Sequence, residues 1–83
     1  MLVTVKARTF PIRNGVLVRS AALGLAGGGQ DVVAATESLR KGVAAWCEGM
    51  RRAGELEAAL ARHGLKWCED STGLTIDIAV DET

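Results

Sequence analysis

The 83-residue sequence predicts a small α+β domain in which one long helix covers one face of a mostly antiparallel sheet. Two patterns predict it. Residues 2–9 and 74–80 alternate apolar with polar side chains, as half-buried strands do, and residues 16–21 begin with an apolar run that is typical of a strand. Between residues 32 and 53, apolar side chains instead recur every three or four positions, as on one face of a helix. The expected order of elements is therefore β-β-β-α-α-β-β, with a short second helix.

The first two strands are expected to form a hairpin. Asn14 and Gly15 lie between them, and this dipeptide is typical of a type I′ turn, because both central residues of that turn have a positive φ. Pro11 has no N–H to donate and is expected to end the regular pairing of the first strand. The second strand then runs over residues 16–21.

Residues 23–31 mark the change from sheet to helix. Residues 23–27 are compatible with a short third strand, and the three glycines at 27–29 are expected to form a loop, because glycine weakens a strand. Asp31 is a good N-cap, since its carboxylate can accept hydrogen bonds from the first N–H groups of a helix. Gly54 is expected to end that helix.

The apolar face of the long helix follows spacings of three and four residues. It consists of Val32, Thr36, Leu39, Val43, Trp46, Met50 and Ala53. Charged residues occupy the other face, where Glu37 and Lys41 have the favourable (i, i+4) spacing. Gly42 and Gly49 lie inside the helix, where each either allows another backbone to approach closely or is simply tolerated.

The rest of the chain repeats both patterns on a smaller scale. Residues 55–63 are expected to form a short helix that Gly64 ends, and residues 65–69 a strand. Residues 70–73 are expected to form a turn. The alternation over residues 74–80 is the cleanest in the chain and predicts the last strand.

Composition bears on partners and location. Ten basic and ten acidic residues give a formal net charge of +0, which argues against a general nucleic-acid binder, because such proteins attract phosphates with a basic surface. Low net charge, small size and 48% hydrophobic residues favour self-association, so we expect a homodimer or higher homo-oligomer. The sequence predicts no signal peptide or membrane-spanning helix, and two cysteines are too few for a disulfide framework. We therefore expect a cytoplasmic protein with free thiols and no membrane contact.

No arrangement of residues predicts catalysis, and we expect no enzyme activity, cofactor or metal. Cys47, His63 and Cys68 are the strong soft-metal ligands, which are one short of a closed zinc site and lack a Cys-x-x-Cys spacing. His63 could instead activate Cys68 as a nucleophile, which leaves a small hydrolase as a further hypothesis. The simpler interpretation is that Cys47 packs beside the helix face and that His63 lies in the last turn of its helix.

Two further groups are expected to have structural roles. The acidic residues Glu69, Asp70, Asp77, Asp81 and Glu82 could pair to bind a divalent metal, but a solvated surface is the simpler interpretation. The glycines before the long helix resemble a phosphate cradle. However, no phosphate-binding motif is complete, and the Asp31 carboxylate would repel a phosphate.

Basic residues cluster on the first hairpin: Lys6, Arg8, Arg13 and Arg19. Lys6 and Arg8 share one face of their strand. These four are the candidate partner-binding residues, which could contact RNA or the acidic surface of a protein. The alternative is that their charges protect an exposed strand edge from aggregation. Aromatic stacking of bases is not expected, because Phe10 is the only aromatic residue on the hairpin.

The order of elements and the residues around the glycines resemble those of HicB-like antitoxins. That family has a core of a three-stranded sheet, a long helix and a further strand, which is a partial RNase H-like fold. Its members carry an Asp-Gly type of hairpin turn, a Pro-Gly pair, and a Gly-Asp-Thr step into a helix rich in Glu-Glu-Ala. The matching positions here are Asn14-Gly15, Leu23-Gly24, Gly29-Gln30-Asp31 and Ala34-Ala35, with Leu39 and Val43 continuing the helical pattern. The similarity covers residues 2–53.

The resemblance implies a single HicB-like α+β domain over residues 1–83, in a short form without the DNA-binding segment of longer members. It implies a non-enzymatic interaction module that binds and neutralises a small toxin ribonuclease. The expected contact surfaces are an exposed strand edge and the basic hairpin. The alternative function is a small domain that binds RNA or another nucleic acid through the basic hairpin.

Overall fold

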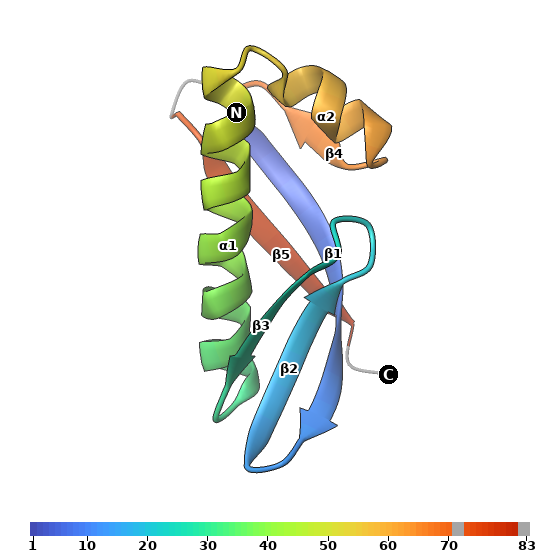
Figure 1. Cartoon of the computed structure of the whole chain (residues 1–83), viewed down its shortest axis with the longest axis vertical. Coiled ribbons are helices and arrows are strands. Elements are labelled where there is room, and N and C mark those ends of the chain that lie inside the picture. Colours follow the sequence, from blue (N-terminus) through green and yellow to red (C-terminus); the bar gives the residue numbers. More distant parts are fainter. Residues whose placement is uncertain (71–72, 82–83) are drawn as a thin grey trace.

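The structure is a computed structural model of the chain that describes residues 1–70 and 73–81. The expected α+β class and order of elements are confirmed (Figure 1). The elements are β1 (Leu2–Ile12), β2 (Gly15–Ser20), β3 (Leu25–Gly29), α1 (Val32–Arg52), α2 (Leu56–Arg62), β4 (Lys66–Cys68) and β5 (Thr75–Asp81). Of the bounds predicted for the strands at 2–9, 16–21 and 74–80, the start at Leu2 is unchanged and the others shift by one to three residues.

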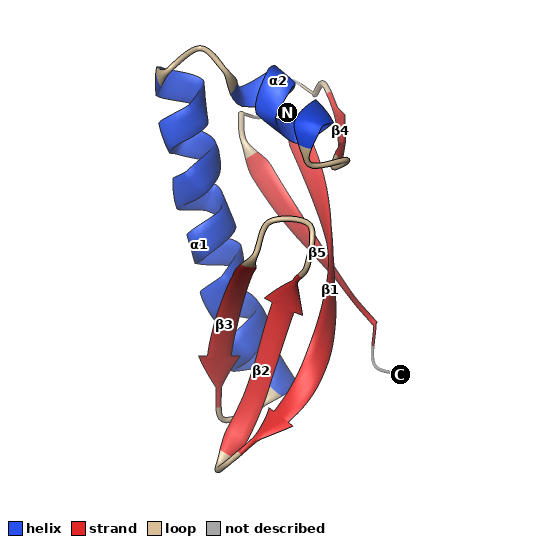
Figure 2. Ribbon diagram, turned by 45° about the vertical axis from the view of Figure 1, so that its right-hand side comes forward, coloured by secondary structure: helices blue, strands red, loops and turns tan. Residues whose placement is uncertain are grey.

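Strand β1 is the centre of the sheet. It pairs antiparallel with β2 and β4 and parallel with β5, while β2 pairs antiparallel with β3. β5 pairs with residues 2–8 of β1 along one edge of that strand. β4 pairs with residues 2–4 of β1 and β2 pairs with residues 8–12, so these two strands must share the other edge. The β2–β3 hairpin therefore lies at one end of the molecule and β4 with α2 at the other (Figure 2).

Helix α1 runs along one face of this sheet (Figure 1). Its fully buried residues are Ala35, Leu39, Val43 and Cys47, at uniform four-residue spacing. The expected apolar face is therefore correct at Leu39 and Val43, but Trp46 and Met50 lie only half-buried at its side. The strands contribute the alternate residues Val3, Val5, Ala7, Val18 and Ile76 to the same core, and α2 contributes Leu56 and Leu60.

Two glycines of β3 allow α1 to lie against the sheet. The expected loop at residues 27–29 is wrong, because these residues complete β3. A Cβ atom at Gly27 would lie 2.6 Å from the carbonyl oxygen of Ala35, and one at Gly29 would lie 2.6 Å from the backbone nitrogen of the same residue. Only glycine fits where two backbones approach this closely, so packing with the helix outweighs the low strand propensity of glycine.

The glycines inside α1 have no such role. A Cβ atom at Gly42 or Gly49 would meet nothing within 4 Å outside the helix's own backbone. Among the described residues no other backbone approaches these positions, so that interpretation is wrong and both glycines are simply tolerated. The expected helix ends are confirmed, since Asp31 accepts a hydrogen bond from the Ala34 N–H at 2.8 Å and Gly54 has φ +72°.

The first hairpin differs from the expectation in its turn. Ile12 pairs with Gly15, so the turn residues are Arg13 and Asn14, one position earlier than expected. Among the residues with described backbones, Asn14 is the one non-glycine residue with a positive φ, at 63°, and Gly15 is not among the positive-φ glycines. The type I′ turn, which needs two positive φ values, is therefore not formed.

Pro11 does not end β1, because the strand continues through it to Ile12. In a hairpin with a two-residue turn, the pair beside the turn is hydrogen-bonded and the next pair is not. Pro11 opposite Val16 occupies that next pair, and β5 accompanies β1 only as far as Arg8. Neither neighbouring strand would accept a hydrogen bond from an N–H at this position, so the proline costs the sheet no hydrogen bond.

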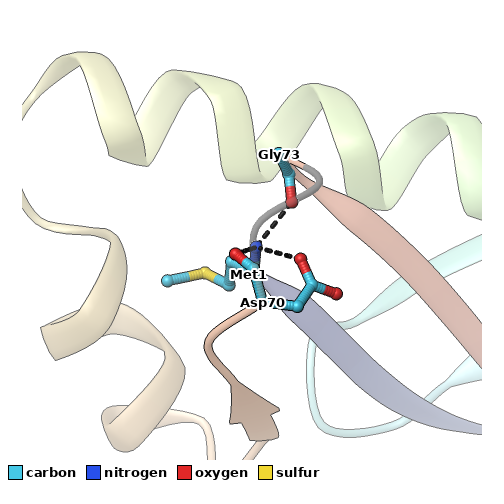
Figure 3. Close-up of polar contacts among 3 residues, drawn as sticks. All are labelled: Met1, Asp70 and Gly73. Carbon is cyan, nitrogen blue, oxygen red and sulfur yellow. Dashed lines mark hydrogen bonds and ion pairs between the residues drawn. The ribbon is translucent and has the colours of Figure 1, made fainter.

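The amino end of β1 is tied to the segment before β5. The Met1 amine lies 3.0 Å from a carboxylate oxygen of Asp70 and also donates to the carbonyl oxygen of Gly73 (Figure 3). The Thr75 N–H donates to the Met1 carbonyl oxygen at 2.8 Å and begins the parallel pairing. These contacts align β5 with β1; the rest of the turn expected over residues 70–73, at residues 71–72, lies outside the described residues.

We predict opposite outcomes for alanine at two neighbouring glycines of β3. Gly27→Ala should lower the free energy of unfolding by about 1–3 kcal/mol, because the added methyl group must push α1 away from the strand. Gly28→Ala is the matched control, since a Cβ there meets only the Val16 carbonyl oxygen, at 3.9 Å, and should leave stability within about 0.5 kcal/mol. Urea unfolding followed by circular dichroism compares them, and equal effects would contradict the close helix–strand contact.

Candidate binding face of the sheet

The face of the sheet opposite α1 carries exposed side chains. We call it the open face and define it by the outward residues of the central strands. From β1 and β2 these are Lys6, Arg8, Phe10, Ile12, Leu17 and Arg19, and from β5 they are Asp77, Ala79 and Asp81. All of them except the half-buried Leu17 are exposed. In the described part of the chain the core contacts of both helices lie on the other face.

Two arginines stand directly opposite each other on the open face. Arg8 of β1 pairs in register with Arg19 of β2, and as a hydrogen-bonded pair their Cα atoms lie about 5.5 Å apart. Like charges directly opposite each other destabilise a sheet. Lys6 follows on the same face of β1. The open face therefore carries three cations at its centre, with the carboxylates of Asp77 and Asp81 on the β5 side and Asp81 in register with Arg8.

Apolar side chains continue the open face toward the hairpin turn. Phe10 is 42% exposed and Ile12 is 46% exposed, which is high for large hydrophobic residues. Leu17 pairs directly with Phe10 across the two strands. Cations and an exposed aromatic ring thus occupy successive positions on one side of β1.

A hollow of about 710 Å³ connects these features. Its lining includes Lys6, Arg8, Phe10 and Arg19, together with Ala21, Ala22, Ala79 and Asp81. The alanines have short side chains that leave the space of the hollow open. Its volume is within the range of ligand sites in proteins. The hollow is therefore cationic on its β1–β2 side and acidic at one point of its β5 side.

The structure brings together three of the four residues expected to bind a partner. Arg13 lies in the hairpin turn, about 16 Å along the strand from Arg8, and does not line the hollow. Edge protection is not the reason for the other charges, because β1 and β2 each have a strand on both sides. The same alternation that places Lys6 and Arg8 together also places Phe10 beside them, so its position was available from the sequence.

The outer edge of β5 is a second surface of interest. Among the described residues no strand pairs with this edge. Because the Thr75 N–H points to β1, alternate residues from Thr75 onward direct their backbone groups inward. The N–H and C=O groups of Ile76, Ile78 and Val80 therefore point away from β1 and are positioned to pair with an added strand.

The two thiols and the histidine are not joined by a hydrogen bond in the described part of the chain. Cys47 is fully buried in the core, and burial raises the pKa of its thiol. Cys68 is exposed on β4, and within the described chain no hydrogen bond connects it to His63. The His63 Nδ1 instead donates to the Ala22 carbonyl oxygen at 3.0 Å, and the imidazole packs edge-on against Trp46 with 5.5 Å between ring centroids.

The acidic residues near the carboxyl end are spread over different surfaces. Asp70 contacts the Met1 amine, whereas Asp77 and Asp81 lie on the open face; Glu82 is outside the described residues. Within residues 1–70 and 73–81, no group of three or more His, Cys, Asp or Glu side chains could hold a metal ion. In the same ranges, neither helix is long and apolar enough to cross a bilayer.

Comparison of the chain with models of protein families gives no match. Comparison with curated proteins and with solved structures likewise gives no match. The open face and the outer edge of β5 are therefore the features of this chain from which a function can be proposed.

We predict that removing one charge of the arginine pair stabilises the protein. Arg19→Gln should raise the free energy of unfolding by about 0.2–1 kcal/mol at low salt, because it relieves repulsion with Arg8. The gain should shrink at high salt, where the repulsion is screened. Arg13→Gln in the turn removes the same charge and should have little effect. A loss of stability in Arg19→Gln alone would show that the pair is not repulsive.

We also predict that the two thiols react very differently with a thiol reagent. Cys68 should react in the folded protein, whereas the buried Cys47 should react only after denaturation. The measurement is the number of thiols labelled before and after adding urea, with Cys68→Ser as the control. If Cys68 is unreactive in the folded protein, the hydrolase hypothesis has no support.

Proposed function

We propose that this protein is a non-enzymatic protein-interaction module of the HicB antitoxin type, which binds and neutralises a small toxin ribonuclease. The resemblance around residues 14–43 suggests the partner, and the confirmed α+β order is consistent with it. The observation that supports it most is the outer edge of β5, which has seven residues and no pairing strand among the described residues.

The edge of β5 is suited to bind a partner by adding a strand to the sheet. Outward-pointing N–H and C=O groups would pair with the backbone of an extended segment of the toxin. The side chains of Ile78 and Val80 are half-buried on the α1 side, so an added strand would cover them further. Backbone pairing would supply affinity, and these side chains would supply selectivity.

Charge favours binding of the toxin at the edge of β5 over binding at the arginine pair. A ribonuclease that holds RNA is expected to have a basic surface, since it must attract phosphates. The cations of the hairpin would repel such a surface, whereas β5 carries Asp77 and Asp81 and no basic residue. Complementary charge would increase the association rate and select the orientation of the partner.

The same edge could join two copies of this chain, and we propose that the free protein is a homodimer. Strand pairing between two β5 edges would be isologous, with the same surface used by both copies. Toxin binding would then compete with dimer formation. Sedimentation that shows only monomers at tens of micromolar would exclude this dimer.

We predict that Val80→Pro abolishes neutralisation of the toxin. Proline removes an N–H that points toward the open edge, and its ring obstructs an added strand, while the hydrogen bonds to β1 are kept. The assay measures RNA cleavage by a small ribonuclease encoded in the neighbouring reading frame, with and without this protein. Inhibition should weaken at least about tenfold, which corresponds to the loss of roughly one or two hydrogen bonds.

Val80→Ala is the matched control, because it shortens the same side chain and keeps the N–H. It should retain most of the inhibition, and circular dichroism should show both variants folded. A neighbouring frame that encodes no such ribonuclease, or a ribonuclease that keeps full activity with excess protein, would contradict the antitoxin function.

A further inference from the structure

The arginine pair on the open face places two like charges directly opposite each other, an arrangement that destabilises a sheet unless an anion lies against it. Arg8 and Arg19 are directly opposite each other, and Lys6 is two residues along the same face. On the other side of β1, Asp81 of β5 is in register with Arg8, so an anion would lie on the β1–β2 side of the cations. An anionic ligand with several charges would relieve the repulsion and satisfy the guanidinium donors.

Phe10 adds a second kind of contact next to the cations. It follows Arg8 by two residues on the same face, a separation of about 7 Å, and its ring is 42% exposed. Such a ring can stack on one base, and each stacked base contributes about 5-fold to 150-fold in affinity. A single aromatic residue cannot form an extended stacking platform, which is why the sequence led us to expect no stacking, but an exposed ring is sufficient for one unpaired nucleotide.

We infer that the open face binds single-stranded nucleic acid, with phosphates on Lys6, Arg8 and Arg19 and one base stacked on Phe10. These four residues line the same hollow of about 710 Å³. Asp81 at the β5 side of the hollow is unfavourable for phosphate and would confine the strand to the β1–β2 side. This surface adjoins the β5 edge proposed to bind the toxin, but its cations and Phe10 come from β1 and β2, so the inference does not depend on that function.

Two other anionic ligands are less compatible with the open face. An acidic peptide would use the cations but would have no need for an exposed aromatic ring beside them. A duplex keeps its bases stacked inside, so its phosphates alone would contact the sheet. The combination of paired arginines with an exposed phenylalanine is therefore best matched by an unpaired nucleotide.

The test is a titration of the full protein with a fluorescein-labelled oligouridylate of roughly ten nucleotides, within the usual site size of single-strand binders. Fluorescence anisotropy is measured between about 50 mM and about 200 mM salt. Three phosphate contacts should give a slope of about −2 for the logarithm of affinity against the logarithm of salt concentration. No binding at the lowest salt would overturn the inference.

Two variants separate the phosphate contacts from the stacked base. Arg19→Gln should reduce the salt slope by about 0.7 and weaken binding, although the variant is expected to be at least as stable as the natural protein. Phe10→Leu keeps an apolar side chain but removes the aromatic ring, so it should weaken binding about fivefold or more with an unchanged salt slope.

Lys41→Gln on the exposed side of α1 is the matched control for charge, and it should leave both affinity and salt slope unchanged. If it weakens binding as much as Arg19→Gln does, binding is general electrostatic attraction and the inference is wrong.

If Phe10→Leu has no effect and a polyglutamate peptide displaces the oligonucleotide, the open face binds an acidic protein segment instead. An RNA-binding protein that does not inhibit the ribonuclease would support this inference and contradict the antitoxin function alone.

Discussion

The contact between α1 and the glycines of β3 determines how far the helix stands from the sheet. Gly27 and Gly29 bring the helix backbone against the strand, so the buried face of α1 is centred on Ala35 and Leu39. A side chain at either glycine would lift the amino half of the helix and open the core beneath it. The one long helix of the described chain covers this face of the sheet, so the charged side chains and the exposed Phe10 and Ile12 lie on the other, which is the candidate binding face.

Local patterns predicted the elements, whereas contacts between distant residues decided their details. Alternation over residues 2–9 and 74–80 identified both long strands because their buried faces differ from their exposed faces. The glycines at 27–29 were misassigned because strand propensity is a local measure, and it is α1 that makes glycine necessary there. The helix face was displaced for the same reason, since closeness to β3 favours the small Ala35 over bulkier neighbours.

The candidate site depends on a single turn. A turn centred on Asn14 and Gly15 would place Arg8 opposite Ala21, whereas the observed turn one residue earlier places it opposite Arg19. The sequence therefore showed that Lys6 and Arg8 share a face but could not show the arginine pair. It also could not show that β1 is central, because that position results from parallel pairing with β5, from the other end of the described chain.

The parallel pairing of β1 with β5 also has a consequence for how the protein is made. Among the described strands, β1 leaves the ribosome first, and β5, which completes its other edge, leaves last. Until then an apolar strand has one edge without a partner, which is the kind of surface that aggregates or recruits chaperones. Closing this pair joins residues at nearly opposite ends of the described chain, and such long-range closure slows folding. The hairpin and α1 could assemble early, whereas the edge proposed to bind the toxin would be the last part of the sheet to form.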